Sequence, residues 1–267
     1  MYLCILMIKA LFFDIDGTLV SFSKLQIPQS TIEAIEQARK NGVKIFISTG
    51  RPPQIMNNIG ALQERGLIDG YITMNGSYCY VGDEIIYKHP IAKDNVQALV
   101  TACKENDYPC IFVGEKEISV CQPNDMLRKI FYDFLRVDEF EVVSFEQGTS
   151  YDSYQLTPFF SIEVENELKK TMRDSEFGRW HPAFVDITAK GNTKQKGMEH
   201  ILEHFNLDVS ETMSFGDGGN DIPMIRFAGV GVAMGNANEE VKKEADYVTT
   251  SVDEDGIANA LKHYGVI

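Results

Sequence analysis

The sequence predicts an α/β fold with a parallel sheet, into which a second module of helices and antiparallel strands is inserted. Short runs at residues 10–13, which are all apolar, and at residues 43–47, which are apolar apart from Lys44, are typical of strands that are buried on both faces of a parallel sheet. Each run ends in a polar cluster, and a helical pattern lies between the two runs. We therefore expect a core of residues 1–82 and 183–267 and an inserted α+β domain of residues 83–182.

The first part of the core alternates between strands and helices. A capping-box pattern at residues 30–33 predicts the start of a helix that ends at Asn41-Gly42. A second helix is expected over residues 53–65, followed by a strand at residues 71–74. The alternation then stops, because Gly82-Asp83 lies between two apolar runs and indicates a two-residue hairpin turn.

The remaining elements are predicted from periodicity and turn signals. In the inserted domain we expect helices over residues 94–106, 124–135 and 165–173, a hairpin around 114–115, and strands at 141–144, 159–163 and 177–180. The core is expected to resume with strands at 183–188, 212–215, 230–233 and 247–249 and helices over 193–206, 223–227, 238–244 and 254–263.

Composition argues against several kinds of partner. The 267 residues carry a formal charge of -14, whereas nucleic acids and anionic membranes require a basic surface. Residues 1–7 are apolar but too few to span a bilayer, and no cleavage site follows them. Five cysteines without metal-site spacing are typical of buried thiols in a reducing compartment. We expect a cytoplasmic monomer or weak homodimer, with Met7 as a possible true start and residues 1–6 as an extension.

Asp14 and Asp16 directly follow the first buried strand. In an extended chain, residues two apart point to the same side, so we expect both carboxylates to converge at the carboxyl end of the sheet. Ligands of open α/β sheets bind at this edge. Two like charges this close require a positive charge between them. Taken alone, Asp-x-Asp-Gly is more typical of a solvated acidic turn with Gly17 as its hinge.

Further polar residues follow other strands of the predicted sheet. Thr49, Asp217 and Asp221 are expected to join Asp14 and Asp16 at this edge. Four carboxylates in one crevice require a counter-ion, and hard oxygen ligands of this kind favour Mg²⁺. We expect Asp14 and Asp217 to bind the ion directly and Asp221 to act through water. The main-chain carbonyl of Asp16 is a candidate for a further ligand oxygen.

An anion would also find donors here. The Thr49 hydroxyl and the Gly50 amide are suited to a phosphate oxygen, although Thr49 also fits an ordinary turn. A cation is expected from Lys190, Lys194 or Lys196 near the start of a predicted helix, where lysines are otherwise usually solvated. A carboxylate nucleophile beside a bound phosphate gives an aspartyl-phosphate intermediate, and a second carboxylate can act as general acid and base.

Four short motifs occur in a fixed order along the chain. They are Asp14-Ile15-Asp16-Gly17-Thr18, Thr49-Gly50-Arg51, Lys190-Gly191-Asn192-Thr193-Lys194 and Gly216-Asp217-Gly218-Gly219-Asn220-Asp221. Together they resemble the four motifs of the haloacid dehalogenase (HAD) superfamily, and most of all its Cof-type sugar-phosphate phosphatases of class IIB. The resemblance spans almost the whole chain. It implies a Rossmann-like parallel-sheet HAD core with an inserted α+β cap domain of type C2B.

The resemblance also implies roles for individual residues. Asp14 would be the nucleophile and Asp16 the general acid and base. The residues implied to hold Mg²⁺ are Asp14, Asp16, Asp217 and Asp221. Those expected to bind the phosphate or the substrate are Asp14, Thr49, Gly50, Arg51, Asn75, Lys194 and Asn220, although turn or capping roles suit Arg51 and Asn75 equally well. Lys194 is favoured over Lys196 because its distance from Gly191 matches the motif, which departs here from the usual Lys-Gly-x-Ser-Lys-Gly.

The implied activity is Mg²⁺-dependent hydrolysis of small phosphate esters, and hexose phosphates are the first candidates for the substrate. An acid at Asp16 points to hydrolysis or to a mutase reaction, since ATPase pumps of the superfamily carry Thr there. A phosphomutase that resembles phosphomannomutases is the nearest alternative. A non-catalytic sensor of phosphorylated metabolites is a weaker one, because it would be expected to lack Asp14 or Asp16.

Substrate choice would belong to the cap, which is expected to close over the core and exclude bulk water. The cap residues that are candidates for substrate contacts are Glu115, Tyr151, Arg179 and His181. Each of these side chains suits a structural or solvated position as well.

Overall fold

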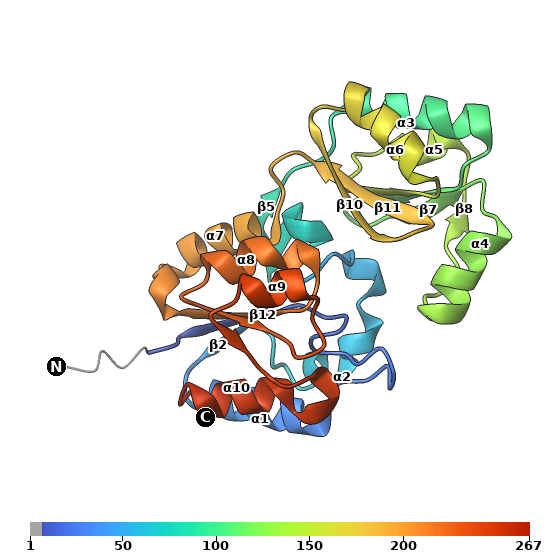
Figure 1. Cartoon of the computed structure of the whole chain (residues 1–267). Coiled ribbons are helices and arrows are strands. Elements are labelled where there is room, and N and C mark those ends of the chain that lie inside the picture. Colours follow the sequence, from blue (N-terminus) through green and yellow to red (C-terminus); the bar gives the residue numbers. More distant parts are fainter. Residues whose placement is uncertain (1–6) are drawn as a thin grey trace. The chain divides into compact units, whose positions relative to one another are not determined.

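The computed structural model describes residues 7–267, which form two compact units (Figure 1). The core unit contains residues up to 51, residues 56–87 and residues 193–267, and the cap unit contains residues 52–55 and 88–192. The extension expected at residues 1–6 lies outside the described residues.

The core unit is built on an eight-stranded sheet in the order β14-β13-β12-β1-β2-β3-β4-β5. The first six strands of this order run parallel, whereas β4 pairs antiparallel with β3. The parallel strands are β1 (Ala10–Phe13), β2 (Lys44–Ser48), β3 (Gly70–Thr73), β12 (Thr212–Gly216), β13 (Val230–Ala233) and β14 (Tyr247–Val248). Strands β4 (Tyr78–Val81) and β5 (Glu84–Lys88) flank the predicted turn at Gly82-Asp83.

Helices cover both faces of the central strand β1, which is why it is apolar and buried at every position. Leu11 and Phe13 of β1 pack in one cluster with α1 and α10, and Phe12 packs in a second cluster with α7 and α8. Phe12 stacks on Phe46 of β2 at 4.9 Å between ring centroids. The helices of the core are α1 (Gln29–Lys40), α2 (Gly60–Gln63), α7 (Lys194–Phe205), α8 (Ile222–Phe227), α9 (Glu239–Lys243) and α10 (Gly256–His263).

The cap unit has its own six-stranded sheet in the order β10-β11-β9-β6-β7-β8. All of its pairs are antiparallel except β7 with β8. Its strands are β6 (Cys110–Val113), β7 (Ile118–Cys121), β8 (Glu141–Val142), β9 (Gln155–Pro158), β10 (Ser175–His181) and β11 (Phe184–Ala189). Its helices are α3 (Lys93–Asn106), α4 (Asp125–Leu127), the π-helix η4 (Arg128–Phe134), α5 (Phe145–Gly148) and α6 (Ile162–Thr171).

The segments that lead into and out of the cap unit are tied together. The Asn192 amide nitrogen donates to the main-chain oxygen of His89 at 3.1 Å, and the Asn192 amide oxygen lies 3.2 Å from Nδ1 of the same histidine. The two ends of the inserted unit therefore lie side by side.

The boundaries between the two units fall at other residues than the sequence predicts. Strand β11, expected in the core, pairs with β10 and β9 in the cap sheet. Strand β5, expected in the cap, extends the core sheet beyond β4. In both cases the pairing partner, which depends on residues distant in the sequence, decides where the strand belongs.

Three predicted elements are wrong. The strand expected at residues 159–163 lies earlier in the chain, as β9 (Gln155–Pro158), and α6 already begins at Ile162. The helix expected over residues 53–65 is broken into the 3₁₀ turns Pro53–Ile55 and Asn57–Ile59 and the short α2. The capping box is absent, because α1 starts at Gln29 and the Ser30 hydroxyl donates to Asp255 instead.

Candidate active site

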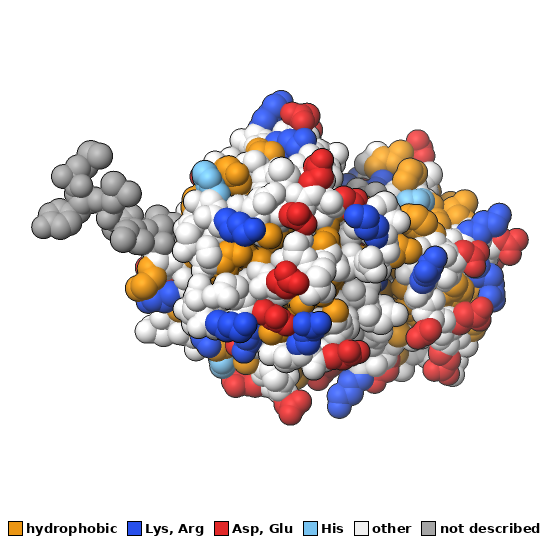
Figure 2. Space-filling model, turned by 90° about the horizontal axis from the view of Figure 1, so that it is seen from below, with side chains coloured by type: hydrophobic (Ala, Val, Ile, Leu, Met, Phe, Trp, Pro, Cys, Tyr) orange, Lys and Arg blue, Asp and Glu red, His pale blue; other side chains and the backbone are white. Residues whose placement is uncertain are grey.

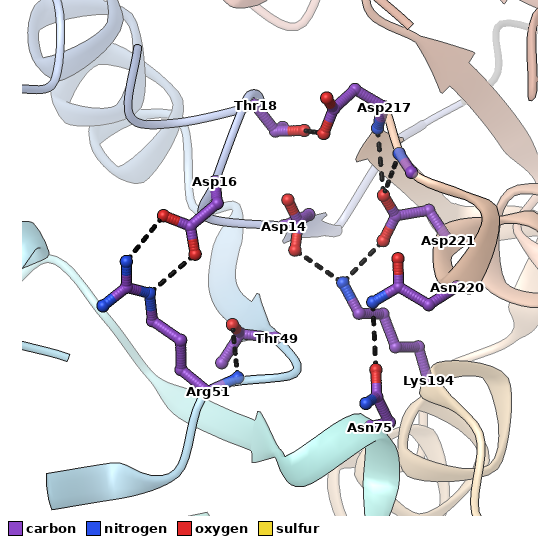
Figure 3. A network of polar contacts seen from close by, with 11 residues as sticks. Asp14, Asp16, Thr18, Thr49, Arg51, Asn75, Lys194, Asp217, Asn220 and Asp221 are labelled. Carbon is purple, nitrogen blue, oxygen red and sulfur yellow. Dashed lines mark hydrogen bonds and ion pairs between the residues drawn. The ribbon is translucent and has the colours of Figure 1, made fainter. Parts of the chain in front are cut away.

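The carboxyl ends of β12, β1 and β2 lie side by side and place polar residues at one edge of the core sheet (Figure 3). Phe13 is paired in register with Phe215 of β12 and with Ile47 of β2. Asp14 follows β1 directly, Thr49 follows β2, and Asp217 follows β12. The sheet thus brings residues from distant parts of the chain to one place.

Helix α7 delivers a buried cation to this edge. The Thr193 hydroxyl caps the helix by accepting a hydrogen bond from the Lys196 amide at 3.1 Å. Two glycines allow α7 to approach the end of the core sheet closely. A Cβ on Gly76 would lie 2.1 Å from the main-chain oxygen of Thr193, and one on Gly197 would lie 2.3 Å from Ile72 Cγ2. Lys194, the first residue of α7, is fully buried as a result.

The Lys194 ammonium joins two carboxylates. Its Nζ lies 2.6 Å from Oδ1 of Asp14 and 2.6 Å from Oδ1 of Asp221. Burial alone lowers the pKa of Lys194, but these two carboxylates outweigh it and raise the pKa above its usual value. Lys194 is therefore a permanent positive charge in the site.

The other two candidate lysines are directed elsewhere. The Lys196 side chain is 43% exposed and pairs with Glu199 at 3.0 Å. Lys190 donates to the main-chain oxygen of Arg173 in the cap unit at 3.3 Å. Of the three, the geometry places only Lys194 among the carboxylates.

The loop after β12 folds around Asp221. Oδ2 of Asp221 accepts hydrogen bonds from the amides of Asp217 and Gly218, both at 2.9 Å. A Cβ on Gly216 would lie 2.4 Å from Cβ of Asp221, so glycine is required there. Both oxygens of Asp221 thus have donors, which suits the supporting role expected for it.

The carboxylates of Asp14, Asp217 and Asp221 form a group that can hold a metal ion. One oxygen from each lies within 4.8 Å of the other two. Three carboxylates and the Lys194 ammonium leave two negative charges. Burial, opposed by Lys194, raises the pKa of Asp14 well above its usual value, and burial with the nearby Asp221 charge raises that of Asp217 to about 7. A hard divalent cation fits both the donors and the charge.

Asp16 lies near this group but is not one of its three members (Figure 3). The Arg51 guanidinium binds it in a bidentate manner, with Nε at 2.6 Å from Oδ2 and Nη2 at 2.8 Å from Oδ1. Asn58 adds a longer contact of 3.4 Å. The extended chain ends at Phe13 and Ile15 begins a turn, so the alternation of a strand does not set the direction of the Asp16 side chain.

The predicted phosphate donors lie at the same edge. The Thr49 hydroxyl is buried and accepts the Arg51 amide at 3.0 Å, which leaves its proton for another acceptor. Asn75, with φ of 52°, accepts a hydrogen bond from the Asn220 amide at 3.0 Å (Figure 3). Asn75 also packs on Gly50, where a Cβ would lie 3.2 Å from Nδ2 of Asn75.

The comparisons with known proteins agree with this geometry. The family model of haloacid dehalogenase-like hydrolases matches residues 11–261. The chain belongs to this family.

Solved structures of the family match almost the whole chain. The HAD subclass IIB sugar phosphatase BT4131 is 59% identical, with a TM-score of 0.93 over 97% of this chain and 100% of its own. A second structure comes from a study of a trigonal-bipyramidal intermediate in a phosphoryl-transfer superfamily. It is 58% identical, with a TM-score of 0.94, and the match covers 98% of this chain and 100% of that structure. The phosphatase BT1666 from Bacteroides thetaiotaomicron is 35% identical, with a TM-score of 0.88 over 98% and 97%.

The expected superfamily, fold class and enzyme class are confirmed by these matches: the protein is a HAD phosphatase with an α/β core and an inserted cap. In the described part of the chain, no helix is long and apolar enough to cross a membrane. Acidic and basic side chains are interspersed on the face seen in Figure 2.

The candidate substrate contacts of the HAD cap have partners within the cap itself. Glu115 pairs with Lys88 at 2.8 Å, and the Tyr151 hydroxyl lies 2.8 Å from that of Ser119. Arg179 binds the buried Glu165 at 2.6 Å. The remaining candidate, His181, accepts the Ala183 amide at 3.1 Å and stacks on Phe184.

Three residues of the HAD site make contacts that the sequence does not predict. Asn58 reaches Asp16, Thr18 donates to Asp217 Oδ1 at 3.3 Å, and Asn236 donates to the Gly17 carbonyl at 2.8 Å. Thr18 stands inside the first motif and could have been found there. Asn58 lies in the 3₁₀ turn Asn57–Ile59 and Asn236 in the turn after β13, and no motif of the sequence places either of them at the site.

Proposed function

We propose that this protein is a Mg²⁺-dependent phosphatase that hydrolyses sugar phosphates and similar small monoesters through an aspartyl-phosphate on Asp14. The observation that carries the proposal is the buried Lys194 ammonium, shared by Asp14 and Asp221 beside a third carboxylate, Asp217. This arrangement keeps a carboxylate nucleophile next to the positive charge that a phosphoryl group requires.

The substrate class rests on the similarity to a sugar phosphatase. BT4131 carries that description, and its 59% identity extends over 97% of this chain, so the similarity includes the cap unit. A phosphatase whose cap has the same fold is expected to select substrates of similar size.

In the first step, Asp14 attacks the phosphorus atom. Its Oδ1 is bound to Lys194, which leaves Oδ2 as the attacking oxygen. The new bond joins Oδ2 to phosphorus while the bond to the sugar oxygen breaks. Asp16 supplies the proton to that oxygen from its protonated form, in which one of its oxygens carries the proton in place of a contact with Arg51. The Thr49 hydroxyl and Lys194 stabilise the charge on the phosphoryl oxygens.

In the second step, water attacks the phosphorus atom of the intermediate. Asp16, now ionised, takes a proton from that water, and the bond between phosphorus and Asp14 Oδ2 breaks. Free phosphate and the Asp14 carboxylate result. The side chain of Asp16 thus moves one proton in each direction per turnover, and Arg51 holds it in place.

The residues that would hold Mg²⁺ are Asp14, Asp217 and the main-chain carbonyl of Asp16, with Asp221 in support. When bound, the ion would neutralise the excess negative charge and favour the approach of an anionic phosphate.

Phosphate release tests this proposal. Hexose phosphates are incubated with the metal-free enzyme, with and without Mg²⁺, and in the absence of any bisphosphate activator, which a phosphomutase would need. We expect release only with Mg²⁺ and none from Asp14→Asn, which keeps the shape of the side chain but removes the nucleophile. Equal turnover by this folded variant would refute the proposed nucleophile.

A further inference from the structure

Asn236 lies in the turn after β13, and its exposed side chain makes three contacts. Its amide nitrogen donates to the Gly17 carbonyl at 2.8 Å and to Oδ2 of Asp217 at 3.4 Å. Its amide oxygen accepts the Val252 amide at 3.0 Å. One side chain therefore joins the turn after β1, the loop after β12 and the turn before α10.

The contact with Gly17 bears on Asp217 directly. Gly17 has φ of +88°, and a Cβ there would lie 2.2 Å from Oδ2 of Asp217. The carboxylate thus packs against the Gly17 main chain without a side chain between them. A group that fixes the Gly17 peptide also fixes the surface on which Asp217 lies.

The Asp217 carboxylate is otherwise held loosely. Among the described residues, its side-chain donors are Thr18 at 3.3 Å and Asn236 at 3.4 Å, one for each oxygen. Both contacts are long compared with the 2.6 Å between Lys194 and Asp14. A weakly held carboxylate keeps its lone pairs for a cation, but its orientation then depends on its neighbours.

We propose that Asn236 is a positioning residue for the metal site: it orients Asp217, through the Gly17 peptide and through its own amide, for binding of a divalent cation. The inference rests on the proposed Mg²⁺ site. A neutral amide suits this position because it donates to both oxygens, which an Asp side chain cannot do, and adds no charge to the cluster.

Calorimetric titration of Mg²⁺ into the metal-free protein tests the proposal without any turnover. Groups that orient metal ligands typically change metal affinity by about 10- to 100-fold. We expect the dissociation constant of Asn236→Ala for Mg²⁺ to rise about tenfold or more. The loss of phosphate release in this variant should be larger at limiting than at saturating Mg²⁺, because excess ion compensates for weaker binding.

The matched control is Asn259→Ala. Asn259 is also exposed and donates two hydrogen bonds, to Thr250 Oγ1 at 2.9 Å and to the Glu254 carbonyl at 3.1 Å, but it touches none of the carboxylates. We expect its Mg²⁺ affinity to equal that of the wild type. An equal loss of Mg²⁺ affinity in both variants would assign the effect to the removal of a surface amide and not to the contacts of Asn236.

Folded Asn236→Ala with wild-type Mg²⁺ affinity would overturn the proposal. If this variant does not fold, Asn236→Gln replaces it, because it places the donor and the acceptor one methylene further out. Its dissociation constant for Mg²⁺ should also rise, and a wild-type value would overturn the proposal. A wild type that binds no Mg²⁺ would refute the metal site and this inference together. A wild type that binds Mg²⁺ but releases no phosphate would refute only the proposed reaction, since calorimetry still decides the role of Asn236.

Discussion

Arg51 holds both carboxylate oxygens of Asp16, at 2.6 and 2.8 Å, although 35 positions separate the two residues. The Arg51 side chain is 12% exposed and the Asp16 side chain 33%, so the pair is partly shielded from water. A planar guanidinium fixes the plane of a carboxylate in a way that an ammonium cannot. Arg51 thereby sets the direction in which the proposed acid and base acts.

Arg51→Lys should therefore impair proton transfer to the leaving group. We expect kcat for a hexose phosphate to fall about tenfold or more, and that for p-nitrophenyl phosphate to fall less, because nitrophenolate leaves without a proton. Steady-state kinetics on both esters checks this. Arg39→Lys is the control, since Arg39 also pairs with an aspartate, Asp69 at 2.9 Å, outside the site. Equal losses on both esters would argue against a role through Asp16.

Lys194 and Lys196 should differ sharply on substitution. Lys194→Met leaves buried carboxylates without their cation, so we expect a loss of about 3 kcal/mol of stability and of about 10²-fold or more in kcat. Lys196→Met removes only a surface pair with Glu199 and should cost less than about 1 kcal/mol. Urea unfolding and phosphate release measure the two effects, and the reverse order would assign the phosphate contact to Lys196.

Gly17 and Gly42 allow backbone strain to be separated from crowding. Both have positive φ, of +88° and +86°, but a Cβ on Gly42 would meet no atom within 4 Å. Gly42→Ala should cost about 1–2 kcal/mol and leave turnover unchanged. Gly17→Ala should cause the same backbone strain and, in addition, displace the Asp217 side chain. Most of the activity should therefore be lost. Thermal unfolding and Mg²⁺-dependent phosphate release distinguish the two, and an active Gly17→Ala enzyme would contradict the close packing.

The stability of the metal-free protein should fall as pH rises from about 4 to about 7. Burial and the Asp221 charge raise the pKa of Asp217 from 3.8 to about 7 in the folded state. In this range the unfolded chain has released the proton that the folded protein still holds, so folding takes up a proton and a higher pH opposes it.

Thermal unfolding across this range, with and without Mg²⁺, measures the effect. The stabilisation by Mg²⁺ should increase with pH, because the ion binds the deprotonated carboxylates. Asp217→Asn, which cannot titrate, should show a weaker dependence on pH in the metal-free state. An unchanged slope in this variant would assign the dependence to other groups.

The position of the site could be predicted because parallel strands end at one edge. Asp14, Thr49 and Asp217 each follow a uniformly buried strand, and this local pattern suffices to place them together. Lys194 was found from its spacing within a motif. Its burial between two carboxylates was not foreseeable, since it depends on the glycines that bring α7 close to the sheet.

The failures have physical causes as well. Strand β9 was missed because Gln155 and Thr157 are polar yet 4% and 2% exposed, and Thr157 donates to Asp186 at 2.7 Å across the cap sheet. Apolar periodicity cannot detect a strand whose polar side chains are paired in the interior. The direction of the Asp16 side chain depends on Arg51, a contact that no local pattern encodes.

The contacts between His89 and Asn192 hold together the two ends of the inserted segment 88–192, which supplies most of the cap unit. A unit whose two ends lie together can be excised, replaced or grafted onto another core without stretching the host sheet. Diversification of such enzymes can then proceed by recombination at these two junctions, while the catalytic edge built by Asp14 and Lys194 is inherited intact.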